Sequence, residues 1–125
     1  ICLPPVQTCK YVNAIAPNGQ QIGTVYGGTN AGLIGMTRTW ALETASQGIT
    51  VNLVAPGPIE TELFTASNPP DLPQTIKIRE SIPVLRFGTP EEIAHAVASL
   101  IDRRAGFITG QVLYACGGMS VGLTG

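Results

Sequence analysis

The sequence is poor in charge. Only 12% of its 125 residues are Asp, Glu, Lys or Arg, half of the ~25% typical of soluble proteins. Seven basic and eight acidic side chains leave a formal net charge of −1. A chain this close to neutral lacks the basic surface that attracts nucleic acids or anionic membranes, so we expect neither as a partner.

Cysteines are also few. Cys2, Cys9 and Cys116 are odd in number and have no CxxC spacing, which fits neither a disulfide framework nor a zinc site. Reduced thiols are typical of a cytoplasmic protein, and we expect that location. No carboxylate pair or His/Cys cluster has metal-ligand spacing, so we expect no bound metal.

No segment is apolar enough for a membrane span. The longest uncharged stretch, residues 11–37, contains a proline and several Asn, Gln and Gly residues, whereas a spanning helix needs ~20 predominantly apolar residues. The chain begins at Ile1 without a charged and then apolar leader, so we expect no signal peptide. A first residue other than Met leads us to expect a piece of a longer protein.

Glycine, proline and aliphatic residues are abundant instead. The 15 glycines and 10 prolines exceed the ~12% typical of soluble proteins. Hydrophobic residues make up 44% of the chain, too many for a disordered protein. A length of 125 residues is enough for one hydrophobic core and not for two, so we expect a single domain.

Apolar patterning predicts alternating strands and helices. Three short apolar segments indicate buried strands at residues 10–16, 49–55 and 111–115. Residues 26–47 are apolar on more than one helical face, which predicts a helix buried on two sides, against the core and against a partner. Residues 74–81 fit a short helix, and the polar residues 67–73 fit a loop.

The strongest helix start is at Thr89. This residue can cap the helix, Pro90 suits the first helical position, and Glu92 completes a capping box. Arg103 and Arg104 fall near the C-terminal end of this helix, where cations favour the helix dipole.

This alternation predicts a parallel sheet with right-handed crossovers. Ligands of such sheets bind at the carboxyl ends of the strands. Because Pro56–Thr61 leaves the carboxyl end of the clearest strand, we expect a binding site there.

Six motifs follow one another along the chain. They are Tyr26-Gly-Gly-Thr-Asn30, Ala31-Gly-Leu-Ile-Gly-Met-Thr-Arg38, Gly48-Ile-Thr-Val-Asn52, Val54-Ala-Pro-Gly-Pro-Ile-Glu-Thr61, Arg86-Phe-Gly-Thr-Pro-Glu-Glu-Ile-Ala94 and Phe107-Ile-Thr-Gly-Gln111, with Gly117-Gly118 near the end. In this order they resemble the C-terminal half of the short-chain dehydrogenase/reductase family, including its 3-oxoacyl-carrier-protein reductase-like members. The resemblance covers residues 26–122 of a single partial domain and leaves residues 1–25 as a poorly matched lead-in. It implies an α/β fold, the C-terminal half of a doubly wound, Rossmann-like parallel sheet.

The family transfers a hydride between the nicotinamide of NAD or NADP and a small-molecule alcohol or carbonyl substrate. The resemblance places Tyr26 at the catalytic acid/base tyrosine. A free phenol has a pKa of ~10, so the family sets a lysine one helical turn later, where its ammonium favours phenolate and holds the ribose. Here that position holds Asn30, which can hydrogen-bond a ribose and carries no charge.

Two further family elements have no match. The serine that polarises the substrate oxygen corresponds to Asn13 by spacing, or to a position near Ala16 if the strand is aligned instead. Neither has a hydroxyl. The glycine-rich phosphate turn is not found in these residues. Glycines in residues 28–35 mimic its spacing, but they fall inside the predicted helix, where close helix packing explains them better.

Of the cofactor-binding segments of the family, the resemblance identifies one in this sequence, the turn Pro56–Thr61. In the family it lies along the nicotinamide, with backbone groups and the threonine meeting the carboxamide. Because Pro58 has no N–H, Ile59 and Thr61 are the better donors. The candidate cofactor-binding residues are Pro56, Gly57, Pro58, Ile59 and Thr61.

Two functional interpretations stay open at this point. The first is an NAD(P)-dependent oxidoreductase, truncated and impaired as it stands, with Tyr26 and Asn30 at the catalytic positions. It would be a homo-oligomer joined through the helix 26–47, with the loop 67–73 as part of a substrate lid. The second is a non-catalytic remnant or interaction module that pairs with homologous subunits, which the missing lysine, serine and glycine turn favour.

Overall fold

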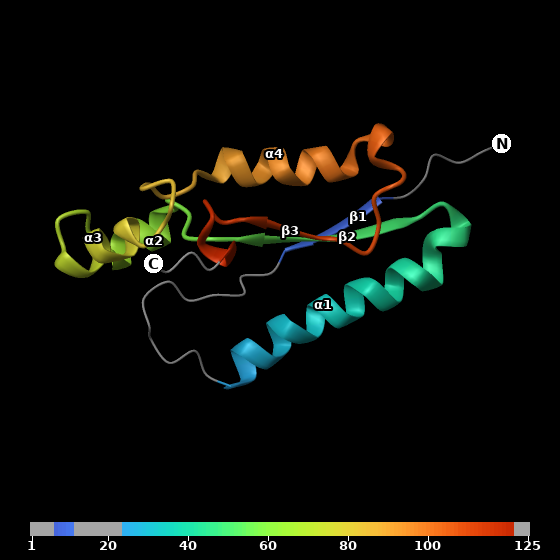
Figure 1. Cartoon of the computed structure of the whole chain (residues 1–125), viewed down its shortest axis with the longest axis horizontal. Coiled ribbons are helices and arrows are strands. Elements are labelled where there is room, and N and C mark those ends of the chain that lie inside the picture. Colours follow the sequence, from blue (N-terminus) through green and yellow to red (C-terminus); the bar gives the residue numbers. More distant parts are fainter. Residues whose placement is uncertain (1–6, 12–23, 122–125) are drawn as a thin grey trace.

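A computed structural model of the protein describes residues 7–11 and 24–121. Its centre is a three-stranded sheet in the order β1-β2-β3, with both pairings parallel (Figure 1). The strands are β1 (Gln7–Tyr11), β2 (Thr50–Pro56) and β3 (Val112–Ala115). The parallel sheet that the sequence predicts is therefore present.

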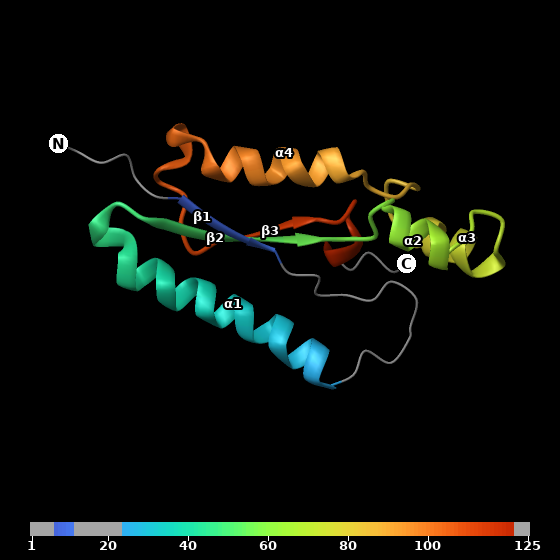
Figure 2. The same ribbon diagram turned by 180° about the vertical axis from the view of Figure 1, so that it is seen from behind.

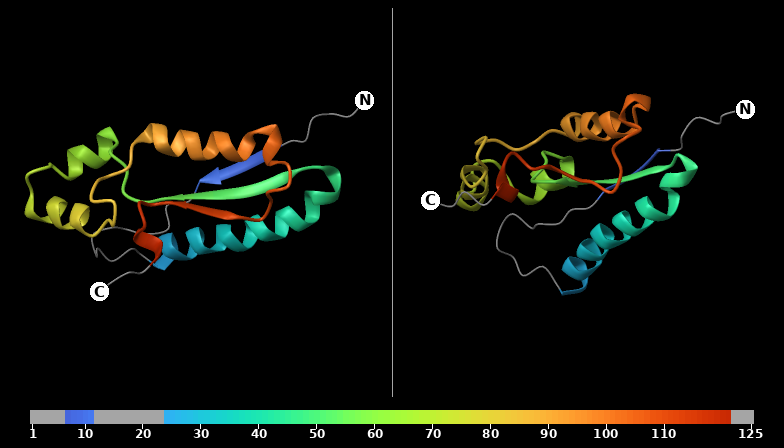
Figure 3. Two further views of the ribbon diagram at one scale, coloured as in Figure 1. Left: turned by 45° about the horizontal axis from the view of Figure 1, so that its top comes forward. Right: turned by 45° about the vertical axis from the view of Figure 1, so that its right-hand side comes forward.

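Helices cover both faces of this sheet. Helix α1 (Thr24–Thr44) lies on one face and α4 (Pro90–Ile101) on the other, as Figures 1 and 2 show from opposite sides. The shorter helices α2 (Glu62–Ser67) and α3 (Pro73–Glu80) lie beyond the carboxyl end of β2 (Figure 3). Because both faces are covered, every residue of β2 is buried, as expected for a central parallel strand.

Side-chain hydrogen bonds hold residues 108–111, which lead into β3, against β2. The Asn52 side chain donates from Nδ2 to the carbonyl of Ile108 at 2.8 Å and accepts from the N–H of Gln111 at 3.1 Å. The Thr109 hydroxyl accepts from the N–H of Val51 at 3.0 Å. Since a buried amide side chain is costly without partners, these bonds fix where β3 begins.

Among the described residues, helix α1 is buried along one side. Its buried residues lie in the C-terminal half, at Thr37 and Ala41, whereas Leu42 is 83% exposed. The described part of the chain has no atom within 4 Å of a Cβ built on Gly28, Gly32 or Gly35. The close packing expected around these glycines is therefore absent within the described chain.

Several predicted elements are confirmed with shifted ends. The capping box at Thr89 is present, with side-chain bonds in both directions between Thr89 and Glu92. The predicted helix 74–81 corresponds to α3. The predicted strand 10–16 overlaps β1 only at residues 10–11, and residues 12–16 lie outside the described residues.

Two features of the elements were not predicted. Helix α2 follows Thr61 directly, in a segment for which the sequence indicated neither a helix nor a strand. The last turn of α4 contains no basic residue, because the helix ends at Ile101 and both arginines lie in a separate 3-10 turn, Arg103–Ala105. There Arg104 pairs with Asp102 through two side-chain contacts of 2.9 and 2.7 Å. Among the described residues, no helix is long and apolar enough to cross a membrane.

Candidate functional site

The candidate site begins where β2 ends. Pro56 is the last residue of the strand, and the N–H of Gly57 donates to the carbonyl of Ala115 at 3.0 Å. A Cβ on Gly57 would lie 2.8 Å from Cα of Cys116, closer than real side chains approach backbone. Glycine therefore lets the turn after β2 lie directly against the turn after β3.

A second contact holds the same loop from its other side. The N–H of Gly88 donates to the carbonyl of Pro58 at 3.0 Å, and the N–H of Glu60 donates to the carbonyl of Gly88 at 2.8 Å. These two bonds form a parallel bridge between Ile59 and Gly88. A Cβ on Gly88 would lie 2.8 Å from Cδ1 of Ile59, so here too glycine permits the approach.

The bridge between Ile59 and Gly88 determines the direction in which the N–H of Ile59 points. Polar backbone groups of successive residues in an extended segment point to opposite sides. Because Pro58 and Glu60 bond toward Gly88, the N–H of Ile59 points away from it. Within the described residues this N–H donates to no acceptor.

Thr61 uses most of its bonding capacity locally. Its N–H donates to the carbonyl of Ile59 at 2.9 Å. Its hydroxyl oxygen accepts from the N–H of Phe64 at 3.2 Å, which caps α2. The hydroxyl hydrogen is then the group of Thr61 that can reach a ligand.

An arginine and a glutamate hold the segment that carries Gly88. Arg86 donates from Nη1 to Oε2 of Glu92 at 2.8 Å and from Nη2 to Oε1 at 2.6 Å. Oε2 also accepts from the N–H of Thr89 at 2.9 Å. The bonds from the Arg86 guanidinium and from the Thr89 N–H lower the pKa of Glu92 to about 2.

A pocket of about 300 Å³ lies behind this loop. Its walls are mainly apolar, with the Arg86–Glu92 pair on one side. The lining residues are Pro58, Ile59, Ile82, Val84, Arg86, Gly88, Glu92, Ile93, Tyr114, Ala115, Cys116 and Gly117.

Cys116 is a buried thiol beside both the loop and the pocket. Burial raises the pKa of this thiol, but hydrogen bonds outweigh the burial and leave the pKa below its usual value. They come from the Ser120 side chain and from backbone groups of residues 118–120.

The predicted catalytic positions lie on α1. Tyr26 is in the first turn of the helix and Asn30 is one turn later, so the two share a helix face. Figure 1 shows that α1 begins at the end of the molecule where β2 ends, with the start of the helix standing off the sheet. Asn30 is half-buried. The roles of both residues stay predictions, and Asn13 and Ala16 lie outside the described residues.

The structure thus joins Pro56–Thr61 to residues 86–92 and 115–117. Sequence reasoning missed the bridge to Gly88 and the Arg86–Glu92 pair, although it identified Glu92 as part of a capping box. The cap at Thr61 had a signal in the sequence, a threonine followed by an acidic and then two apolar residues. No group of three or more His, Cys, Asp or Glu side chains in the described ranges could hold a metal ion.

Comparison with known proteins identifies relatives over most of the chain. The family model of enoyl-(acyl carrier protein) reductases matches residues 7–120. A 3-oxoacyl-[acyl-carrier-protein] reductase of Vibrio harveyi is 45% identical over 117 residues, which are 88% of this chain and 47% of that protein. A (2S)-[(R)-hydroxy(phenyl)methyl]succinyl-CoA dehydrogenase subunit of Thauera aromatica is 43% identical over 98 residues, 78% of this chain and 38% of that one. The chain thus spans less than half of the length of these relatives.

Solved structures share the fold. A short-chain dehydrogenase/reductase of Serratia marcescens aligns with a TM-score of 0.78 and 32% identity, over 91% of this chain and 45% of that chain. An Agrobacterium tumefaciens protein assigned as a 2-deoxy-D-gluconate 3-dehydrogenase, solved with bound NADP, aligns with a TM-score of 0.81 and 31% identity over 94% of this chain and 47% of that chain. The predicted doubly wound, Rossmann-like α/β fold is confirmed.

Proposed function

The chain belongs to the short-chain dehydrogenase/reductase family, and we propose that it forms the C-terminal half of an NAD(P)-dependent oxidoreductase. The chain is a single partial domain over residues 1–125, in which residues 1–25 lead into the part, residues 26–122, that carries the family motifs. The substrate is a small-molecule alcohol or carbonyl compound, and cysteine usage supports a cytoplasmic location.

The observation that carries this proposal is the N–H of Ile59. It lies in the loop after the central strand, where parallel sheets bind ligands, and it has no acceptor among the described residues. A nicotinamide carboxamide oxygen is a fitting acceptor, and the Thr61 hydroxyl can donate beside it. Gly57 and Pro58 bring the loop to this position, and Pro56 joins it to β2.

The chemistry divides between the cofactor and the chain. When bound, the nicotinamide supplies or accepts the hydride. The loop Pro56–Thr61 orients the ring, which reduces the entropy cost of bringing the reactants together. Tyr26 passes the proton to or from the substrate oxygen. Asn30 bonds the ribose and, being neutral, gives the phenol no charge assistance, so proton transfer is slow in this chain.

A cofactor titration tests the proposal. NADH or NADPH fluorescence should change and saturate when the chain is added, because the loop holds the nicotinamide in a fixed, less aqueous setting. Unchanged fluorescence at millimolar cofactor would remove the oxidoreductase function from this chain.

A second candidate function is an interaction module that pairs with homologous subunits. The exposed face of α1 favours it, with Leu42 at 83% exposure and no described atom of another segment within 4 Å of a Cβ on Gly28, Gly32 or Gly35. The same face makes homo-oligomer formation through the helix 26–47 part of both proposals. Size-exclusion chromatography of the chain with an intact homologue should show a complex, and two separate peaks would argue against pairing.

A further inference from the structure

We propose that Arg86 and Glu92 are positioning residues for the loop Pro56–Thr61. Their ion pair fixes the segment that carries Gly88, and the bridge from Gly88 then fixes the direction of the Ile59 N–H. The pair acts through backbone and need not touch the ligand. This inference rests on the proposed function, because the loop matters for catalysis only if it holds the nicotinamide.

The contacts between the pair and Gly88 are short and redundant. Both guanidinium Nη atoms of Arg86 reach Glu92, at 2.8 and 2.6 Å, and Nη1 also donates to the carbonyl of Phe87 at 3.0 Å. The Glu92 carboxylate accepts from the N–H of Thr89 at 2.9 Å. Hydrogen bonds of this network therefore hold the residues on both sides of Gly88 in the sequence, which are Arg86, Phe87 and Thr89.

The segment is in turn attached to the loop at several points. The bridge bonds join Gly88 to the backbone of Pro58 and Glu60 at 3.0 and 2.8 Å. The ring of Phe87 packs edge-on against Phe64 of α2, with ring centroids 4.9 Å apart. Because the bonded residues lie on both sides of Ile59, a shift of Gly88 must rotate the peptide that carries the Ile59 N–H.

The exposure of the Arg86–Glu92 pair indicates a local role rather than a contribution to the stability of the whole fold. The two side chains are 57% and 47% exposed, and solvent-exposed ion pairs contribute little to the stability of a fold. Loss of the ion pair should therefore leave the fold intact and loosen the bridge between Ile59 and Gly88. Amide hydrogen exchange can detect such a local opening.

The test measures amide hydrogen exchange by NMR on the 125-residue chain. In Glu92→Gln the side chain can still accept from Thr89, because glutamine supports a capping box, but it loses the ion pair. Exchange of the Glu60 and Gly88 amides should accelerate about two- to fivefold. In Glu92→Ala the cap is lost as well, and the acceleration should reach about tenfold or more.

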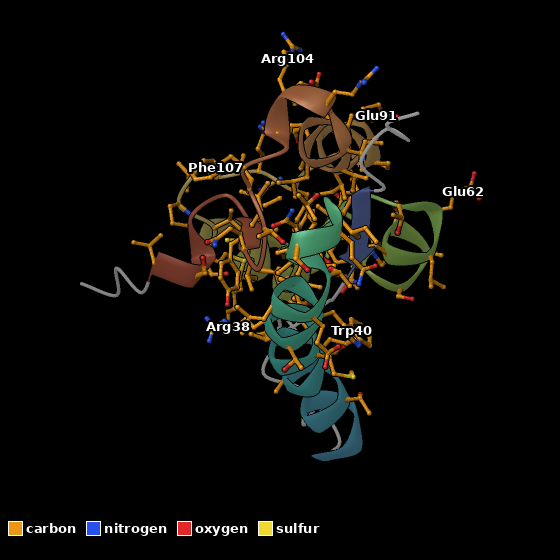
Figure 4. The ribbon with its side chains drawn as sticks, turned by 90° about the vertical axis from the view of Figure 1, so that its right-hand side faces the viewer. Arg38, Trp40, Glu62, Glu91, Arg104 and Phe107 are labelled. Carbon is orange, nitrogen blue, oxygen red and sulfur yellow. The ribbon has the colours of Figure 1, made fainter. Side chains whose placement is uncertain are left out.

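Two controls make the result specific. Asp102 holds Arg104 through 2.9 and 2.7 Å contacts and also accepts from the N–H of Arg104 at 2.8 Å. Asp102→Asn and Asp102→Ala therefore remove a matched capped ion pair. Figure 4 shows Arg104 projecting outward from the α4 side of the molecule, far from Glu62 at the start of α2. The Gly57 amide, bonded to Ala115, is the internal reference.

The proposal predicts acceleration at Glu60 and Gly88 in the Glu92 variants, with the Gly57 amide and the Asp102 variants unchanged. Equal acceleration at Gly57, or no acceleration in Glu92→Ala, would overturn it. NADPH affinity separates the two proposals: because only the closed bridge presents the Ile59 N–H, affinity should weaken in the Glu92 variants by at most the factor by which exchange accelerates. If the unaltered chain binds no NADPH while the exchange pattern holds, the proposed function fails and the positioning of the loop by the pair stands.

Discussion

At the scale of single residues, Gly57 shows how closely the two turns of the site approach each other. A Cβ there would meet Cα of Cys116 at 2.8 Å, and backbone cannot move aside as the end of a side chain can. Gly57→Ala should therefore destabilise the chain by about 1–3 kcal/mol, measured as a lower midpoint of urea unfolding.

Gly28→Ala is the matched control for that substitution. Gly28 lies inside α1 with no described atom within 4 Å of its Cβ position. Alanine there should stabilise the helix by about 0.5–1 kcal/mol. Equal midpoints for the two variants would contradict the close approach at Gly57.

Asn30 is the residue whose substitution tests the proton-transfer assignment. An ammonium one helical turn after Tyr26 favours the phenolate, so Asn30→Lys, combined with Asn13→Ser, should raise carbonyl reduction at pH 7 by about tenfold or more. Asn30→Gln with Asn13→Ser keeps the neutral amide and should give no gain. No gain from the lysine variant in a chain that binds cofactor would show that the defect extends beyond these side chains.

At the scale of elements, the start of α4 predicts a pH dependence. Arg86 and the Thr89 N–H hold the pKa of Glu92 at about 2, below its ordinary value of 4.5. A carboxylate with a lowered folded-state pKa contributes stability above its ordinary pKa and loses this contribution as the pH falls toward 2. Between pH 5 and pH 2, the urea midpoint of the unaltered chain should fall more steeply than that of Glu92→Gln. Parallel curves would contradict the coupling.

The same elements show what the sequence could predict. Local signals located β2, from its apolar run before Pro56, and the start of α4, from the capping residues at Thr89. The loop Pro56–Thr61 was also identified as a binding site, because it follows the carboxyl end of this strand. The bridge between Ile59 and Gly88 was out of reach, because periodicity and caps describe neighbours in sequence and this contact joins distant segments. Helix α2 was missed because a six-residue helix has too few positions to show a period.

At the scale of the whole molecule, α1 has a face that the described residues leave exposed. The exposure of this face, with Leu42 at 83%, supports the proposal of a homo-oligomer joined through this helix. Leu42→Ser should shift the chain toward the monomer in sedimentation velocity at a given concentration. Leu63, 80% exposed on α2, gives the control variant Leu63→Ser, which should leave the distribution unchanged. An identical shift for both variants would place the contact elsewhere.

We propose that the loop after β2 holds the nicotinamide through the N–H of Ile59. The most direct measurement is an NMR titration of the isotopically labelled chain with NADPH, following the backbone amides of residues 57–61. The Ile59 amide should shift in a saturable way, and by more than the Gly57 amide, which is already bonded to Ala115. An Ile59 amide that does not move at millimolar NADPH would contradict the claim.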